Sequence, residues 1–221
     1  MNIFGIIGHS ESGKTRLIRQ LIPELKQRGY TVAVIKHCPH GFELDTEGKD
    51  SWKFIEAGSD AVSILSTDRV AILKKYKSKL NPKNIIGQYF STIDVILVEG
   101  YKENKAIKKI EVLQKGISEE LECSPEELIA VVSDFEVNID KPVFHPDQTG
   151  KIVEYLEDFM ERRTSSVSLH IDGDSVPMNV FVQKIFKNTI LGMVNSLEDI
   201  QENPELITLT LTRKEKNNEK A

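Results

Sequence analysis

The sequence has 221 residues, of which 39% are hydrophobic and 29% charged, and its formal net charge is −5. This balance is typical of a globular protein with one good-sized domain and a small appendage. The negative charge argues against a broad nucleic-acid-binding surface. Two cysteines, Cys38 and Cys123, make no disulfide framework, which favours a reducing compartment. The start of the chain has no signal-peptide features, and no apolar run approaches the roughly 18 residues of a membrane span, so we expect a cytoplasmic protein with no membrane partner.

Short apolar runs alternate with longer periodic segments over the first 160 residues, a pattern typical of an α/β protein with a mainly parallel twisted sheet flanked by helices. The first strand is predicted over residues 2–7 and the first helix over about residues 14–28. Pro23 lies inside that helix and predicts a kink or an early break. Further strands are predicted over residues 31–36, 61–65, 70–73, 94–100, 109–114 and 128–134, and further helices over about residues 50–57, 82–90 and 151–160.

The pattern changes after residue 163. Residues 167–178 predict a strand with a turn at Asp172–Gly173, residues 179–200 predict one amphipathic helix, and residues 205–214 alternate like a strand. We therefore expect a first domain over residues 1–163, a small β-α-β module over residues 167–212 and a disordered tail over residues 213–221. The role of the module is open, and a docking surface is one hypothesis.

The stretch GHSESGKT, from Gly8 to Thr15, satisfies the phosphate-binding pattern G-x-x-x-x-G-K-[ST], the P-loop. A predicted strand precedes it and a predicted helix follows, as this loop requires. Glycines let successive backbone N–H groups approach phosphate oxygens near the positive end of a helix. We expect Lys14 to contact the β- and γ-phosphates and the Thr15 hydroxyl to ligate Mg²⁺. Nucleotide binding is the strongest prediction of the sequence.

A carboxylate at the end of a neighbouring strand usually organises the magnesium of a P-loop. Glu99 ends the predicted strand DVILVEG and so lies where ligands of open α/β sheets bind. Asp94 begins the same strand and is expected at the opposite edge. The candidate metal ligands are therefore Thr15, Glu99 and Asp45, the last from the loop described next.

Within the polar stretch KHCPHGFELDTEGKD, residues 37–49 are predicted to form a loop that overhangs the nucleotide. Its two histidines and one cysteine, within residues 37–40, do not have a common zinc-site spacing. We expect Asp45 and Asp50 to face magnesium or substrate, where either is a candidate catalytic base, and Lys36 and Lys49 to neutralise phosphate charge. The alternative is a surface loop without a ligand.

Three stretches together, GHSESGKT, VAVIKHCPHGFELDTEGKDSWKFIEAGSD and VILVEGYK, resemble the MobB family of molybdopterin-guanine dinucleotide biosynthesis adapter proteins in order and spacing. The resemblance covers roughly residues 1 to 160. The family pattern usually has Phe where Tyr101 stands.

The resemblance implies a P-loop fold that binds GTP with Mg²⁺ and has weak GTPase activity at most. It implies an adapter for the nucleotidyltransferase that joins GMP to molybdopterin in molybdenum cofactor biosynthesis, often as a homodimer. The residues predicted to contact nucleotide are Gly8, His9, Ser10, Glu11, Ser12, Gly13, Lys14, Thr15, Arg16, Lys36, His37, His40, Lys49, Gly100, Lys102 and Asp134.

Guanine selection is left open, because the usual Asn-Lys-x-Asp motif is absent. Asp134 either accepts hydrogen bonds from the base or caps the end of its strand. The lysine-rich residues 74–79 and 102–109 either attract phosphates or form a solvated face. Two other functions also stay open: a P-loop phosphotransferase acting on a small molecule, and a regulatory protein whose nucleotide is structural.

Overall fold

The computed structural model describes residues 2–42, 46–76, 82–90, 92–160, 167, 169–171, 174–176, 178, 180–198 and 206–211. The chain divides into two compact units, Met1–Ser165 with His170–Ser175, and Ser166–Leu169 with Val176–Ala221. The predicted domains of residues 1–163 and 167–212 stay a prediction, and the predicted tail lies outside the described residues.

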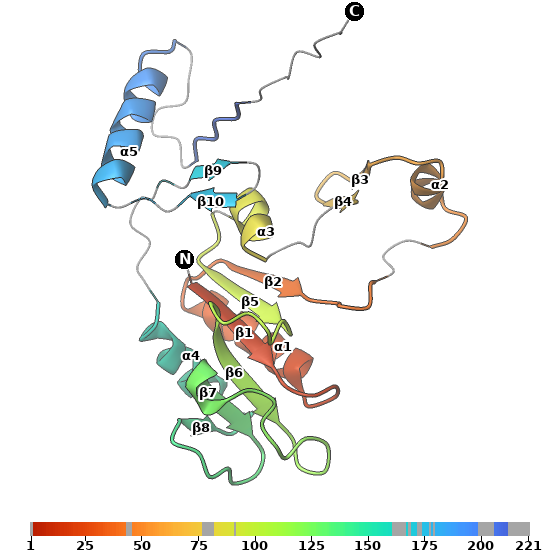
Figure 1. Ribbon diagram of the computed structural model, residues 1–221, viewed down its shortest axis with the longest axis vertical. Helices are drawn as coiled ribbons and strands as arrows, with labels where there is room; N and C mark the ends of the chain where they lie inside the picture. Colours follow the sequence, from red (N-terminus) through yellow and green to blue (C-terminus); the bar gives the residue numbers. More distant parts are fainter. Residues whose placement is uncertain are drawn as a thin grey trace, which may run out of the picture. The chain divides into compact units, whose positions relative to one another are not determined.

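The core of the first unit is a six-stranded sheet in which every neighbouring pair is parallel (Figure 1). Its order is β2-β5-β1-β6-β7-β8. The strands are β1 (Asn2–Ile7), β2 (Val32–Lys36), β5 (Val95–Glu99), β6 (Lys108–Leu113), β7 (Leu128–Ser133) and β8 (Val143–Phe144). Because all strands run the same way, their carboxyl ends meet at one edge, and the strand order changes direction at β1. Ligands of such sheets bind at this switch point.

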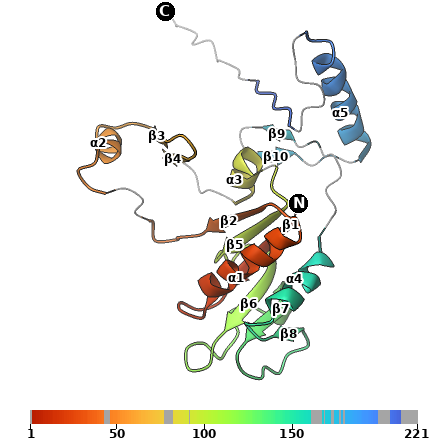
Figure 2. The same ribbon diagram turned by 180° about the vertical axis from the view of Figure 1, so that it is seen from behind.

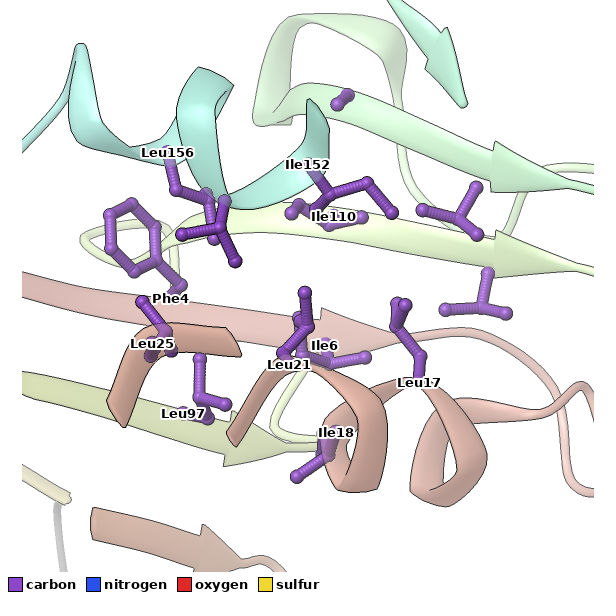
Figure 3. Packing of buried hydrophobic residues seen from close by; sticks show 14 of the residues in the cluster. Phe4, Ile6, Leu17, Ile18, Leu21, Leu25, Leu97, Ile110, Ile152 and Leu156 are labelled. Atoms are coloured by element: carbon purple, nitrogen blue, oxygen red, sulfur yellow. The ribbon is translucent and has the colours of Figure 1, made fainter. Parts of the chain in front are cut away.

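Helices α1 (Lys14–Gln27) and α4 (Thr149–Glu157) pack against one face of the sheet (Figure 2). Their apolar faces meet alternate strand residues such as Phe4 and Ile6, which are almost fully buried (Figure 3). Helix α3 (Pro82–Tyr89) packs through Ile86 against Ile96 and Val98, which alternate along β5 with the residues that face α1 and so lie on the other face of the sheet. Burial on both faces explains why the strands are continuous apolar runs. The predicted α/β class is confirmed.

Helix α1 runs to Gln27, so the early break predicted as one outcome of Pro23 does not occur, and the other outcome, a kink, stays a prediction. Proline removes one backbone hydrogen bond from a helix interior. Leu21 and Leu25, on either side of it, are both fully buried against the sheet, and this packing holds the helix together across the gap.

Residues 61–65 and 70–73 are strands as predicted, but they do not join the central sheet. Strands β3 (Ala61–Leu65) and β4 (Val70–Lys74) pair with each other as an antiparallel hairpin after helix α2 (Asp50–Glu56). Only Val62 of these ten residues is buried. A strand inside a parallel sheet is covered on both faces, and these are not. The sequence also did not indicate β8 or the 3₁₀ turn η1 (Pro125–Glu127).

Strands β9 (Leu169–Ile171) and β10 (Asp174–Val176) form a two-stranded sheet, and helix α5 (Val180–Val194) follows them in the chain. The predicted turn at Asp172–Gly173 lies outside the described residues. Helix α5 ends at Val194, short of the predicted end. Residues 206–211 form no strand, so the predicted strand there is wrong over that range. An alternating pattern gives a strand only where a sheet edge accepts it, and Leu209 and Leu211 are exposed. No helix in the described parts of the chain is both long enough and apolar enough for a membrane span.

Candidate functional site

The loop between β1 and α1 passes closely over the end of β6, and its glycines make this possible. A Cβ atom at Gly8 would lie 2.4 Å from the carbonyl oxygen of Val112, and Gly8 has a φ of +133°. Gly13, at the start of α1, has a φ of +96°. L-residues rarely adopt such angles, so both positions need glycine. The two glycines of the predicted P-loop therefore shape it as the motif requires.

The start of α1 presents backbone donors beside this loop. The first helical hydrogen bond runs from Leu17 N to Gly13 O at 2.9 Å, so the N–H groups of Lys14, Thr15 and Arg16 precede the helical ladder. The Ser12 hydroxyl is buried and has no hydrogen-bond partner among the described residues. Free donors at a helix N-terminus attract anions. The residues present fit a phosphate group.

Lys14 lies across the mouth of the loop. Its Nζ donates hydrogen bonds to the carbonyl oxygens of Gly8, at 2.9 Å, and of His9. Burial lowers the pKa of Lys14, whereas the nearby carboxylates of Glu99 and Glu122 act to raise it. A partly desolvated cation of this kind gains more from a phosphate than an exposed lysine would.

Glu99 joins the P-loop to the edge of the sheet. Its two carboxylate oxygens have different partners: Thr15 Oγ1 donates to Oε2 at 3.0 Å, and Lys36 Nζ lies 3.4 Å from Oε1. The sheet sets this geometry, because Glu99 is in register with Ile6 of β1 on one side and with Lys36 of β2 on the other. The predicted neighbours Thr15, Glu99 and Lys36 are thus brought together.

The Thr15 hydroxyl and the Glu99 carboxylate fit Mg²⁺. This ion takes oxygen ligands and is usually held by one or two protein groups, with water and substrate phosphates completing its shell. The third candidate, Asp45, lies outside the described residues. The described part of the chain contains no cluster of three or more His, Cys, Asp or Glu side chains that could hold a metal ion by themselves.

The start of the histidine-bearing loop contacts the turn after Glu99. The backbone N–H of His37 donates to Glu99 O at 3.0 Å, and the rings of His37 and Tyr101 meet edge to face, with centroids 4.6 Å apart. Gly100 and Tyr101 both have positive φ angles, of +83° and +66°. A non-glycine residue in this region is strained, and such strain concentrates at functional sites.

Other predicted contacts are engaged elsewhere. Asp50, the first residue of α2, pairs with Lys53 at 3.3 Å, and its side chain is 86% exposed. Lys102 pairs with Glu122 at 3.2 Å. In the described parts of the chain, no hydrogen bond or ion pair connects His40, Lys49 or Asp50 to the P-loop. The roles of these residues stay predictions.

Two buried charges on β6 were not recognised from the sequence. Lys109 is 1% exposed and pairs with Glu127, so this lysine belongs neither to a solvated face nor to a phosphate surface. Glu111 is fully buried and accepts the backbone N–H groups of Glu122 and Cys123. Burial raises the pKa of Glu111. The overlooked signal is the spacing, because two charges two residues apart in a buried strand share one face.

The ends of β7 and β8 border an open hollow of about 710 Å³. Residues 133–138 line it together with Val143 and His145. Asp134, at the end of β7, uses Oδ1 to accept the backbone N–H of Lys115 at 2.8 Å. Asp134 therefore caps the neighbouring loop, and it is also one of the residues that line the hollow.

Residues 3–134 match the family model described as MobB, molybdopterin guanine dinucleotide synthesis protein B. The chain belongs to this family. A relative from Haemophilus influenzae, named molybdopterin-guanine dinucleotide biosynthesis adapter protein, is 35% identical over 159 residues, which cover 72% of this chain and 89% of the relative. A second relative, from Methanocaldococcus jannaschii, is named "Putative molybdopterin-guanine dinucleotide biosynthesis adapter protein". It is 25% identical, and the match covers 96% of this chain and 97% of the relative.

A solved structure titled molybdopterin-guanine biosynthesis protein B (mobB) superposes with a TM-score of 0.56. It is 29% identical in sequence and covers 72% of this chain and 99% of its own. The MobB resemblance and the P-loop fold that it implied are confirmed.

Proposed function

We propose that this protein is a GTP-binding adapter that assists the attachment of GMP to molybdopterin in molybdenum cofactor biosynthesis. The main observation behind this proposal is that Glu99 contacts both Thr15 and Lys36 at the end of a complete P-loop. The chain that carries this site belongs to the MobB family. The names of the relatives support the adapter role. The P-loop supports the part of the proposal that concerns nucleotide and magnesium binding.

The chain's own groups have distinct tasks in this proposal. The N–H groups at the start of α1 and the Nζ of Lys14 bind the phosphates. Thr15 and Glu99 would hold Mg²⁺, which supplies charge neutralisation between the β- and γ-phosphates when bound. Lys36, which lies 3.4 Å from Glu99, would then turn to the nucleotide and balance the negative charge of the γ-phosphate. Each contact holds the nucleotide, and none removes a proton from a nucleophile.

This arrangement favours holding over turnover. A general base must reach the proton that it removes. Among the described residues, Glu99 is the carboxylate that contacts the P-loop, and in this proposal it would hold Mg²⁺ together with Thr15 instead of accepting a proton. Asp50 is exposed and paired with Lys53. We expect weak GTPase activity at most, far below the roughly 1–100 per second of a dedicated kinase.

The implied partners are the molybdopterin-guanine nucleotidyltransferase and its molybdopterin substrate. A homodimer and a cytoplasmic location are further parts of the proposal. The β3–β4 hairpin and helix α5 both carry exposed apolar side chains, Leu65 and Phe181 among them.

A reconstituted reaction tests the function. The nucleotidyltransferase, molybdopterin, GTP and Mg²⁺ are mixed with wild-type protein, with Lys14→Ala, or with neither, and the guanine dinucleotide product is followed. We expect wild-type protein to raise its yield or rate and Lys14→Ala not to. No effect of the wild-type protein would refute the adapter role. Rapid phosphate transfer from ATP or GTP to a small acceptor without any partner would favour the phosphotransferase instead.

A further inference from the structure

The hollow at the ends of β7 and β8 is connected to the P-loop on two sides. On one side, Asp134 holds the backbone N–H of Lys115, and the preceding residue, Gln114, places its Oε1 3.9 Å from where a Cβ of Gly13 would lie. The hollow thus borders the P-loop through the loop that follows β6.

The second connection runs through the loop before α4. His145 lines the hollow, and its Nδ1 lies 3.5 Å from a carboxylate oxygen of Asp147. Asp147 in turn forms an ion pair at 3.2 Å with Arg16, the residue after the magnesium candidate Thr15. The hollow is therefore connected to Gly13 of the P-loop through the loop after β6, and to Arg16 in the first turn of α1 through the loop before α4.

The sheet also sets the direction in which a bound nucleotide must extend. Glu99 lies on the β5 side of β1, so the magnesium and the γ-phosphate belong on that side. The ribose and base then extend the other way, over β6 toward β7. Two strand spacings separate β1 from β7, about 10 Å. A nucleoside attached to phosphates in the P-loop spans a distance of this order.

We propose that this hollow is the base-binding subsite and that Asp134 selects guanine. This inference rests on the proposed function, because it requires phosphates in the P-loop. Asp134 Oδ1 is held by Lys115, which fixes the carboxylate, and the exposed side chain leaves Oδ2 for a ligand. Guanine presents two donors, N1–H and the 2-amino group, on its pairing edge. Adenine presents an acceptor at N1, which a carboxylate repels.

Guanine and pterins share this 2-amino-oxo edge, so the hollow has two candidate sources of the same chemistry. The connections to Gly13 and Arg16 favour the base of a P-loop-bound nucleotide. A free pterin would need neither connection. The experiment below separates the two sources.

The test compares wild-type protein with Asp134→Asn by calorimetry, using the full chain, Mg²⁺, GTP, xanthosine triphosphate and ATP. The asparagine keeps an oxygen for the Lys115 N–H, while its amide now donates to the ligand and matches the 2-oxo group of xanthine. We expect GTP to bind roughly 10- to 100-fold more weakly and the xanthine nucleotide to bind more tightly by a similar factor. Glu136→Gln neutralises another carboxylate lining the hollow and should leave both affinities unchanged.

A second measurement needs no variant and so does not depend on how Asp134→Asn folds. Wild-type protein should prefer GTP to inosine triphosphate, which lacks the 2-amino group, and inosine triphosphate to ATP. Equal affinity for all three would overturn the proposal. The proposal would also be overturned if Asp134→Asn kept full GTP affinity while Lys14→Ala lost it. That result would still support the phosphate site of the proposed function. Failure of wild-type protein to bind any nucleotide would overturn the proposed function and this subsite together.

The pterin alternative has its own arm, with neopterin as the probe. Neopterin binding that persists in Lys14→Ala and disappears in Asp134→Asn, with GTP binding unaffected by Asp134→Asn, would assign the hollow to a pterin and overturn the proposal. We expect no such binding.

Discussion

The carboxyl edge of the sheet has two halves that are built differently. The phosphate half, at the ends of β1, β5 and β2, is a connected set of charged contacts in which Glu99 joins Thr15 to Lys36. The base half, at the ends of β7 and β8, is an open hollow with Asp134 fixed by one backbone N–H. The difference indicates that affinity for the phosphates and preference for one base depend on separate groups of residues. Damage to the phosphate half should weaken all nucleotides, whereas damage to the base half should change which one binds.

The largest expected effect comes from Lys14→Ala in the phosphate half. The variant loses the cation at the mouth of the loop, and charge-assisted hydrogen bonds of this kind contribute about 1.5–3 kcal/mol each. We expect GTP and ATP affinities to fall alike, by ~100-fold, in calorimetric titrations. Lys26→Ala, at the far end of α1, removes the same charge as a control. A loss confined to GTP would contradict the separation of the two halves.

Glu111→Ala acts on the strand between the halves. Glu111 anchors the loop that carries Glu122, and its loss leaves two backbone donors without their acceptor. We expect the free energy of unfolding to fall by about 2 kcal/mol, measured by urea denaturation. Glu120→Ala, exposed in the same loop, should change it by less than about 0.5 kcal/mol. Equal stability of the two variants would show that Glu111 does not hold this loop.

Glu99→Gln should weaken the magnesium dependence more than the phosphate contacts. The amide keeps a hydrogen-bond acceptor for Thr15 but loses the charge that attracts the ion and pairs with Lys36. We expect Mg²⁺ to improve GTP affinity in wild-type protein but hardly in the variant, a difference of ~10-fold. Glu103→Gln is the exposed control. Full magnesium dependence in Glu99→Gln would remove Glu99 from the metal site.

The smallest expected effect is a pH dependence of stability from Glu111. Burial raises the pKa of Glu111 in the folded protein, and this effect outweighs the backbone hydrogen bonds from Glu122 and Cys123, which act to lower it. A folded-state pKa above the unfolded one means that the group favours folding most below the unfolded pKa, and that this contribution is lost as pH rises through the folded pKa. The stability difference between wild-type protein and Glu111→Ala should therefore shrink as pH rises from 4 to 8. A difference that grows with pH would show the opposite shift.

Much of the phosphate half could be predicted from the sequence, because its signals are local. The glycine spacing, Lys14 and Thr15 are contiguous, and Glu99 follows a buried apolar run whose end is easy to place. Parallel strands then bring these ends to one edge without further information.

The hollow beside Asp134, strand β8 and the separation of β3 and β4 from the central sheet could not be predicted, because they depend on contacts distant in sequence. Strand β8 has only two residues and forms through pairing with β7. The Asp134 contact with Lys115 depends on the register of β6 and β7, in which Leu113 pairs with Ser133. Within the ranges that the structure describes, strands β3 and β4 pair only with each other, and residues 206–211 form no strand. An alternating pattern alone does not predict whether a segment will pair with the central sheet.

The most direct test of the central claim is calorimetric titration of the wild-type protein with GTP, with and without Mg²⁺. The account predicts binding at one site per chain that is stronger with Mg²⁺ and weaker for GDP, because Lys14 and the metal both act on the γ-phosphate side. Absence of GTP binding, or binding indifferent to both Mg²⁺ and the γ-phosphate, would contradict it.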